Sequence, residues 1–379
     1  MKKILRTLSS ELKRYYNLNK VLVVIGARQV GKTTLLKELT LEDGNTLWLN
    51  GDDPATRERL TEISIASIKR VVGEYKTVVI DEVQRIKNPG LLLKMMVDNM
   101  GKVQFIATGS SSLEIAETIF EPLTGRQFLF RLHPFTLEEL YKGKSVFEIE
   151  QELPFHLIYG CYPEVSLKRD ISEKLLENIA EQYLYKDVLI WKDIRKPQLL
   201  DKLLKLLAFQ IGSEVSVSEL ANSMKVKSET VETYIDLLEK SFVIFRLKSF
   251  SNNPRKEVSK MSKIYFWDNG IRNAVIGNFN DLSQRNDQGE LFENFIISER
   301  MKMNTYFRPK IKSYFWRTYK KSEVDYIEVE GDNVSAFEIK WNMKKKHRIS
   351  KAFINAYPQA ATKIITPVEI DFILDYGEL

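Results

Sequence analysis

The residues best able to do chemistry stand in one short stretch near the N-terminus, which reads Gly-Ala-Arg-Gln-Val-Gly-Lys-Thr over residues 26–33. This spacing of two glycines, a lysine and a threonine is typical of a loop that binds nucleotide phosphates. An apolar run at residues 21–25 precedes it and predicts a buried strand, and a helical pattern follows it. A loop between a strand and a helix N-terminus presents backbone N–H groups and a positive dipole end to an anion. We therefore expect ATP to bind here.

The residues of this loop have separate expected roles. Lys32 would reach the β- and γ-phosphates as a catalytic cation, and the Thr33 hydroxyl would bind Mg²⁺. Gly26 and Gly31 permit backbone angles that a Cβ would forbid. The predicted nucleotide-binding residues of the loop are Gly26, Ala27, Arg28, Gln29, Val30, Gly31, Lys32, Thr33 and Thr34.

A second group of chemically capable residues follows the apolar run at residues 78–80, which predicts a buried parallel strand. Asp81 would hold Mg²⁺ through water, because a hard cation prefers carboxylate oxygen. Glu82 would be the catalytic base that polarises the attacking water, and such a base typically contributes about 10²–10⁴-fold to a rate. Asp-Glu pairs are common at strand ends, so this assignment depends on the phosphate loop upstream.

The elements that must position these residues alternate between strand and helix. Further strands are predicted at residues 46–49, 103–108 and 128–132, and helices at residues 91–100 and 113–120. This alternation predicts an α/β fold, in which a parallel P-loop sheet has flanking helices and binds its ligand at the carboxyl ends of the strands.

Polar residues near the ends of the later strands are further candidates. Thr108 or Ser110 would sense the γ-phosphate, although a polar turn explains them equally well. Arg126 is the candidate arginine finger, because charge that develops on the γ-phosphoryl group needs a fixed cation. Arg85 and Arg131 compete for that role, and the sequence leaves open whether Arg126 acts within its own subunit.

These segments together resemble the prokaryotic AAA-type P-loop ATPases that carry an uncharacterised C-terminal domain. The resemblance extends over nearly the whole chain, and Cys161 stands where a second glycine is usual. It implies ATP binding and a nuclease-like C-terminal fold. Beyond the phosphate loop, the resemblance is carried by residues 79–84, 107–111, 123–126, 132–136, 159–165, 266–270, 289–294, 323–325 and 337–340.

Composition limits the classes of protein to which the chain could belong. With 379 residues, 44% hydrophobic and 28% charged, the chain suits two or three globular domains. No apolar run approaches the roughly 20 residues of a membrane span, so we expect no membrane partner and a cytoplasmic location. One cysteine and three histidines exclude a disulfide framework and a typical zinc site, and nothing supports a Cys–His nucleophile. The expected domains are residues 1–150, 151–278 and 279–379.

The middle segment has the element order of a winged helix. Helices are predicted at residues 216–224, with Ser216 and Glu219 as a capping box, and at residues 228–240, followed by a strand hairpin. Four carboxylates on the second helix are expected to face outward, where they would repel a polyanion. A protein-docking or structural module is therefore favoured over DNA binding, which remains possible through the wing. The four carboxylates are Glu229, Glu232, Asp236 and Glu239.

The C-terminal segment places acidic residues on strand-like runs. Strand alternation puts Glu338 and Lys340 on one face, and a hairpin with residues 323–327 would bring Asp325 to them. Asp325 and Glu338 would hold Mg²⁺, with Lys340 beside the attacking water, and Glu293 could add a ligand. The order is similar to that of PD-(D/E)xK nucleases. A degenerate nuclease fold or weak surface ion pairs would explain the same residues.

A basic run at residues 344–348 follows this pattern, and it is either a solvated turn or a contact for DNA or RNA phosphates. The whole chain is interpreted as a Mg²⁺-dependent ATPase of AAA type, coupled to remodelling of nucleic acid or of a partner protein. The alternatives are an ATP-gated nuclease and a slow nucleotide-dependent signalling switch. An oligomer is compatible with each of them.

Overall fold

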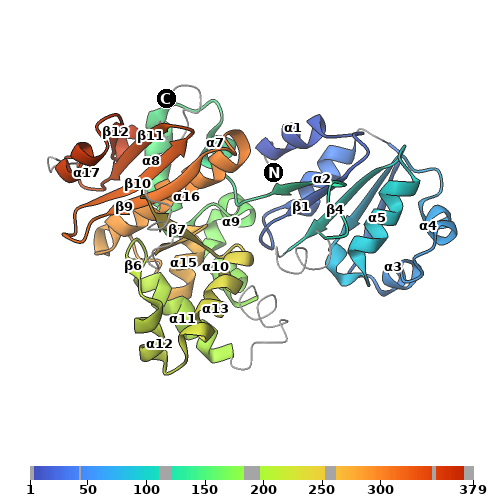
Figure 1. Ribbon diagram of the computed structural model, residues 1–379, viewed down its shortest axis with the longest axis horizontal. Helices are drawn as coiled ribbons and strands as arrows, with labels where there is room; N and C mark the ends of the chain where they lie inside the picture. The colour runs from blue at the N-terminus through green and yellow to red at the C-terminus, as the bar shows by residue number, and fades with distance from the viewer. Residues whose placement is uncertain are drawn as a thin grey trace. The chain divides into compact units, whose positions relative to one another are not determined.

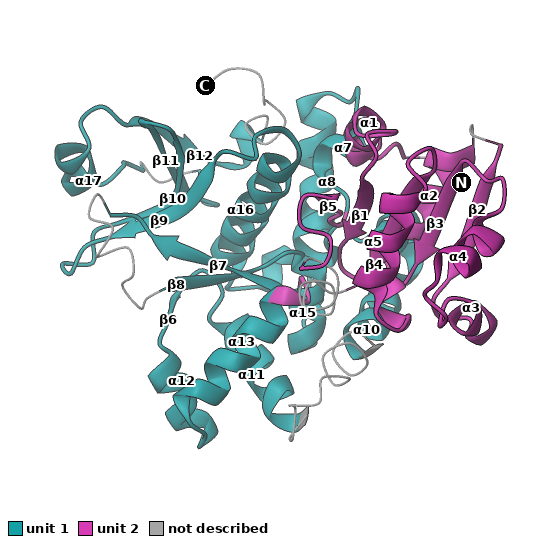
Figure 2. Ribbon diagram, turned by 45° about the vertical axis from the view of Figure 1, so that its right-hand side comes forward, with its two compact units in different colours: residues 1, 135–239, 243–379 teal, residues 2–134, 240–242 magenta. Residues whose placement is uncertain are grey.

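A computed structural model describes residues 4–41, 44–110, 121–182, 197–251, 262–343 and 347–370. The chain divides into two compact units (Figure 2). The N-terminal unit comprises residues 2–134 and 240–242, and the C-terminal unit comprises residue 1 and residues 135–239 and 243–379. Each unit has its own sheet.

The N-terminal unit is built on a five-stranded sheet in the order β2-β3-β4-β1-β5, with every neighbouring pair parallel (Figure 1). The strands are β1 (Val21–Ile25), β2 (Thr46–Asn50), β3 (Thr77–Asp81), β4 (Gln104–Gly109) and β5 (Gln127–Arg131). The flanking helices are α1 (Thr7–Arg14), α2 (Lys32–Thr40), α3 (Pro54–Arg59), α4 (Ile65–Val72) and α5 (Pro89–Asn99). The predicted parallel α/β fold is confirmed. The helix predicted at residues 113–120 lies outside the described residues.

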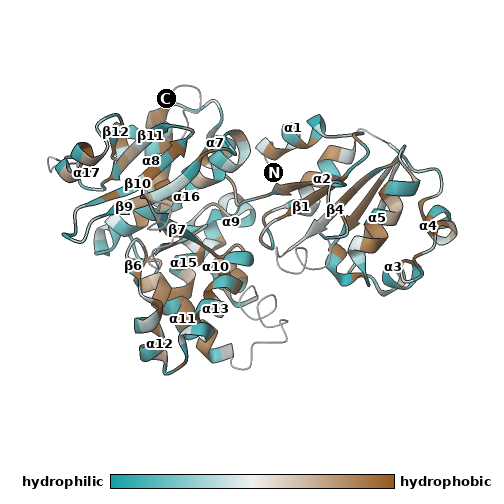
Figure 3. Ribbon diagram, viewed as in Figure 1, coloured by the Kyte–Doolittle hydropathy of each residue, from teal (hydrophilic) through white to brown (hydrophobic). Residues whose placement is uncertain are grey.

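Burial explains why these strands lack an alternating pattern. Every residue of β1 and β4 is buried, as expected for strands covered on both faces, and Figure 3 shows the sheet largely in the colour of apolar residues. Because the strands are parallel, the segments that follow β1, β3 and β4 all leave the sheet on the same side, at the carboxyl ends of the strands, which we call the carboxyl edge. This edge carries the phosphate loop and the acidic pair.

The C-terminal unit contains a seven-stranded mixed sheet in the order β12-β11-β10-β9-β7-β8-β6. Its strands are β6 (Glu214–Val215), β7 (Ile244–Ser249), β8 (Ser262–Phe266), β9 (Lys312–Arg317), β10 (Glu323–Glu330), β11 (Asn333–Ile339) and β12 (Ala361–Ile365). One sheet therefore joins the middle and C-terminal segments, across the boundary expected at residue 278. The C-terminal unit is α/β as predicted.

The C-terminal unit also contains helices, which lie around this second sheet (Figure 1). They are α7 (Leu137–Tyr141), α8 (Val146–Tyr159), α9 (Pro163–Leu167), α10 (Ser172–Gln182), α11 (Pro197–Phe209), α12 (Val217–Met224), α13 (Ser228–Lys240), α15 (Asn269–Ile276), α16 (Gln288–Phe307) and α17 (Lys351–Ala356). Within the described residues, no helix has both the length and the apolar character needed to cross a membrane.

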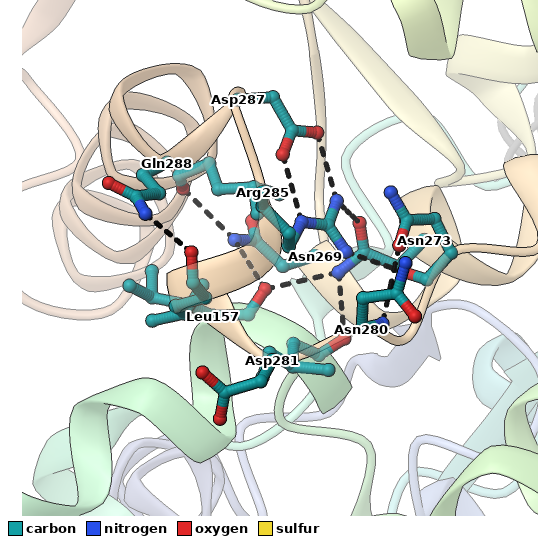
Figure 4. Close-up of polar contacts among 12 residues, drawn as sticks. Leu157, Asn269, Asn273, Asn280, Asp281, Arg285, Asp287 and Gln288 are labelled. Atoms are coloured by element: carbon teal, nitrogen blue, oxygen red, sulfur yellow. Dashed lines mark hydrogen bonds and ion pairs between the residues drawn. The ribbon is translucent and has the colours of Figure 1, made fainter.

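A buried polar network holds α8, α15 and α16 together (Figure 4). The Asn269 amide donates to the carbonyls of Leu157 and Leu291, at 3.2 and 2.9 Å, and Asn273 donates to Leu157 at 3.1 Å. Arg285 binds Asp287 through two nitrogens, at 2.8 and 2.9 Å. Buried carbonyls left without donors would be costly, so these contacts fix the helix ends. Asn269, in one of the segments that carry the resemblance, thus has a structural role.

Candidate active site

The backbone of the phosphate loop requires glycine at both of its glycine positions. Gly31 has φ +94° and precedes α2, and a Cβ on Gly26 would lie only 2.1 Å from the Leu132 carbonyl oxygen. A side chain at either position would therefore strain or displace the loop. The loop also follows directly from β1 and leads into the N-terminus of α2, the geometry that suits a phosphate group.

Lys32 closes the loop on itself. Its side chain is buried, and Nζ donates to the carbonyl oxygens of Gly26 and Ala27 at 2.8 and 2.9 Å. Phosphate oxygens would compete with these carbonyls for the same amine. Arg6 supports the loop from outside, because its guanidinium donates to the carbonyls of Val30 at 2.8 Å and His133 at 2.5 Å. The role of Arg6 was missed, since only its place in a basic N-terminal segment marked it.

The acid at the end of β3 is held beside the loop threonine. The Thr33 hydroxyl donates to Asp81 Oδ2 at 2.8 Å, and the Thr108 hydroxyl donates to Asp81 Oδ1. Thr108 also accepts a hydrogen bond from the Glu82 N–H at 3.1 Å. A hydroxyl and a carboxylate in contact are a donor set that suits Mg²⁺. Within the described residues, neither Asp81 nor Glu82 is paired with a cationic side chain.

Glu82 occupies a left-handed backbone conformation, with φ +50° and ψ +48°, at the start of a short 3₁₀ turn, η2 (Val83–Arg85). Gln84 donates to Glu82 Oε2 at 2.7 Å and to the Ser110 hydroxyl at 3.3 Å. Ser110 is therefore linked to the expected base, whereas Thr108 positions Asp81 and Glu82. The sequence contained Gln84 in the expected segment but gave no signal for this contact.

Arg126 lies at the end of the sheet opposite the phosphate loop of its own chain. Its carbonyl accepts a hydrogen bond from the N–H of Val21, the first residue of β1, at 2.9 Å. Its guanidinium pairs with Asp98 at 2.6 Å. The phosphate loop follows the last residue of β1, at the opposite edge, so Arg126 does not serve the loop of its own chain. Arg131, which lies in register with Ile25, is at the correct edge.

Arg85, the other alternative, follows β3 and lies with Nε 3.6 Å from Asp52. It is also at the carboxyl edge, because Asp52 follows the last residue of β2. Arg85 and Arg131 are thus better placed than Arg126 within one chain. Whether Arg126 acts on the loop of another subunit stays a prediction.

A second cluster forms in the C-terminal unit around Lys340. The antiparallel register of β10 with β11 pairs Tyr326 with Phe337, which puts Asp325 opposite Glu338. Lys340 Nζ lies 2.8 Å from Asp325 Oδ2 and 2.8 Å from Glu338 Oε1. These two oxygens are thus at most about 5.6 Å apart, twice that distance. The structure therefore brings together the three residues expected to converge.

The cluster continues toward α16 and β8. Glu293 Oε1 accepts from the Tyr265 hydroxyl at 2.6 Å and from Lys263 Nζ at 3.2 Å, and Lys263 also pairs with Glu323. Burial, with the nearby Asp325 carboxylate, raises the pKa of Glu293 to about 7. Lys263 was not anticipated. Its alternation with Tyr265 on β8 was a signal, but nothing local linked β8 to this cluster.

The metal site expected at Asp325 and Glu338 stays a prediction, and the two carboxylates lie close together around Lys340. Among the described residues, no group of three or more histidine, cysteine, aspartate or glutamate side chains is placed to hold a metal ion. Lys340 contacts one oxygen of each of these two carboxylates. Glu338 Oε2 is buried without a hydrogen-bond partner. Residues 344–346 of the basic run lie outside the described residues.

The acidic face of α13 is not free. Arg246 on β7 pairs with Glu232 at 2.7 Å, with Glu239 at 2.7 Å and with Asp236. Three of the four carboxylates expected to face outward thus converge on one guanidinium. The fourth, Glu229, is exposed and forms no ion pair within the described residues. The sequence did not predict these ion pairs, because the helical period of α13 does not show that β7 lies beside it.

Cys161 and His156 lie together but do not form a nucleophile pair. Sγ is 3.4 Å from His156 Nδ1, and the same nitrogen is 2.9 Å from the Gly160 carbonyl oxygen. Burial raises the pKa of the Cys161 thiol and lowers the pKa of His156 to about 4. A buried thiol without a low pKa is inert.

Family models match three segments of the chain. Residues 18–141 match the AAA domain, residues 150–282 match a domain of unknown function (DUF8612), and residues 288–372 match another domain of unknown function (DUF4143). The N-terminal match contains the phosphate loop and the acidic pair. These matches support an AAA-type P-loop ATPase domain followed by a C-terminal DUF4143 domain. ATP binding is supported at the level of that family.

Proteins of other organisms are similar to this chain over most of its length. An uncharacterised protein of Mycobacterium tuberculosis is 27% identical over 341 residues, which are 88% of this chain and 73% of that protein. An uncharacterised protein of Methanocaldococcus jannaschii is 25% identical over 300 residues, 67% of this chain and 62% of that protein. Among solved structures, the Walker-type ATPase of Pyrococcus abyssi aligns with a TM-score of 0.48 and 16% identity, over 71% of this chain and 94% of that one.

Proposed function

We propose that this protein binds ATP with Mg²⁺ at the loop of residues 26–34 and hydrolyses it. The observation that carries the proposal is the contact chain from Thr33 through Asp81 to Thr108, which sets a carboxylate beside the loop hydroxyl. Mg²⁺ bound there would neutralise charge that develops on the transferred phosphoryl group.

The residues of the site would have separate roles in ATP binding and hydrolysis. Lys32 would exchange its two carbonyl contacts for phosphate oxygens, and Asp81 and Thr33 would hold the metal. Glu82 would orient and deprotonate the attacking water. Gln84 holds the Glu82 carboxylate in one orientation and connects it to Ser110. Arg85 and Arg131 are the cationic candidates for the γ-phosphate, and Arg126 could act only on the loop of another copy of the chain.

For the C-terminal unit we propose a winged-helix-like module and a nuclease-like module that dock a partner. The order α11-β6-α12-α13-β7-β8, with β6 and β7 both paired to β8, supports the first. Asp325, Glu338 and Lys340 in contact, with Glu293 on α16, support the second. We propose domain limits of 1–150, 151–278 and 279–379, and a partner protein rather than DNA at α13, whose carboxylates bind Arg246.

Turnover measurements test this proposal. The ATPase rate of the full chain is measured with and without duplex DNA or RNA, alongside a Mg²⁺/Mn²⁺ cleavage assay. Glu82→Gln should bind ATP but turn over at least about 10²-fold more slowly, because the base is lost while its shape is kept. Glu74→Gln, at an exposed position of the same unit, is the matched control.

Each alternative gives a different result. Cleavage that requires ATP would favour an ATP-gated nuclease, and slow turnover that nucleic acid does not change would favour a signalling switch. A Glu82→Gln variant that hydrolyses ATP at the rate of the parent protein would exclude Glu82 as the base.

A further inference from the structure

Lys263 is a buried charge that the proposed ATPase does not use. It lies on β8 with its side chain 2% exposed, and Nζ lies 3.2 Å from Glu293 Oε1 and pairs with Glu323. The Phe315 ring lies 5.7 Å from the same nitrogen. Lysine is almost never fully buried unless it is paired, so the two carboxylates must hold this ammonium in place.

Each carboxylate of this cluster pairs with at least one cationic side chain of the protein. Lys263 serves Glu293 and Glu323, whereas Lys340 serves Asp325 and Glu338. Arg317 adds a third cation, 2.8 Å from Glu214 and 3.6 Å from Glu323. Three cations therefore stand among five carboxylates. A divalent ion that entered this cluster would meet two ammonium groups at the oxygens that it needs.

We propose that the ammonium group of Lys263 takes the place of a divalent cation in this cluster, so that the C-terminal unit keeps its acidic residues together without a metal ion. Lys340 follows Glu338 closely in sequence, but Lys263 comes from a strand two places from β9 in the sheet and reaches α16 and β10. Its charge thus joins the segment of residues 150–282 to that of residues 288–372.

The phosphate loop of the same chain shows what an uncovered pair of acids looks like. Asp81 and Glu82 are contacted by hydroxyl and amide groups, and within the described part of the chain no ammonium or guanidinium pairs with them. Lys32, the nearest lysine in the loop, donates to backbone carbonyls. The chain therefore leaves one acidic site open to a cation and covers the other with its own lysine.

Binding of Mn²⁺ tests the inference directly. The nucleotide-free full chain is titrated with Mn²⁺ at pH 7.5, and the free ion is followed by electron paramagnetic resonance. In the wild type we expect no saturable Mn²⁺ site at this cluster. Neither Glu323→Gln nor Asp325→Asn should therefore remove a Mn²⁺ site from the protein. In Lys263→Met, which keeps a similar length but not the charge, we expect one Mn²⁺ site per chain. Its affinity should exceed that of any wild-type binding at this cluster at least about tenfold, because Glu293 and Glu323 lose their cation and become available as ligands.

The controls separate charge from packing. Lys263→Arg keeps the cation and should bind no more Mn²⁺ than the wild type, and Glu323→Gln in the Lys263→Met background should remove the new site. The proposal is overturned if the wild type binds one Mn²⁺ per chain that Asp325→Asn abolishes, or if folded Lys263→Met binds no better than the wild type. Should Lys263→Met not fold, the wild-type titration alone decides, because the proposal requires that it show no such site.

Discussion

Nucleotide binding depends at the residue scale on one amine, that of Lys32. We expect Lys32→Ala to weaken ATP binding at least about 30-fold, because charge-assisted hydrogen bonds contribute about 2 kcal/mol. The variant should stay folded, since Lys32 lies on a ligand-binding loop and its amine donates to two loop carbonyls. Isothermal calorimetry measures the affinity, with Lys37→Ala, an exposed lysine of the same helix, as control. Equal affinities in the two variants would remove Lys32 from the site.

His156 gives the C-terminal unit a pH dependence. Burial lowers its pKa to about 4, and the neutral ring is held between Gly160 O at 2.9 Å and the Tyr141 hydroxyl at 2.6 Å. Because the folded pKa lies below the unfolded value of about 6.5, the unfolded chain binds the extra proton between these values. The stability contributed by His156 is thus complete above pH 6.5 and is lost as the pH falls toward 4.

Urea unfolding of the wild type and of His156→Gln, from pH 7.5 to pH 4.5, checks this. The unfolding free energy of the wild type should fall relative to that of the variant, by up to about 1.4 kcal/mol per pH unit for one proton. Comparison with the variant cancels the other titrating groups. A difference that stays constant over this range would contradict the prediction.

At the scale of elements, the contact between α13 and β7 decides what the acidic helix can do. Arg246 draws Glu232, Asp236 and Glu239 together, so this face is a folded ion network and not an array of free charges. Such partly exposed pairs contribute about 0.2–1 kcal/mol each. Reversal of Glu232 and Asp236 to lysine should leave Arg246 paired with Glu239 alone and produce a basic face.

The double variant Glu232→Lys/Asp236→Lys should therefore bind duplex DNA more tightly than the wild type and with a steeper salt dependence, since each new phosphate contact releases counterions. Fluorescence anisotropy at two salt concentrations measures both effects. The control is Glu58→Lys/Glu62→Lys, which makes the same change in net charge at exposed positions of the N-terminal unit. If the two variants gain equally, α13 has no special access to DNA. Loss of a defined oligomer in the first variant would instead mark its carboxylates as an interface.

For the whole molecule, the two compact units carry separate acidic sites. The five strands of the N-terminal sheet and the phosphate loop all fall within residues 2–134. We expect residues 2–134, expressed alone, to fold and to bind ATP with an affinity within about fivefold of that of the full chain, because the Lys32, Thr33 and Asp81 contacts lie inside it. Circular dichroism and calorimetry measure the two outcomes. A fragment that folds but does not bind ATP would show that the site requires residues beyond 134.

The sequence by itself determined the parts that depend on local pattern. Apolar runs identified the parallel strands, and the glycine, lysine and threonine spacing identified the phosphate loop between β1 and α2. Strand alternation also predicted that Asp325, Glu338 and Lys340 share a face, because neighbours on a hairpin are set by a period of two. In each case the deciding residues are close in the chain or belong to adjacent strands.

Only the tertiary structure decided which distant charges meet. The direction of β5 relative to β1 puts Arg126 at the end of the sheet opposite the phosphate loop of its own chain. Arg246 and Lys263 form ion pairs with carboxylates on other elements, and the order of strands in the sheet determines which of these residues lie close together. Periodicity reports which face of an element a residue occupies. It does not report which element that face will meet, and burial among several carboxylates is what fixes the charge of Lys263.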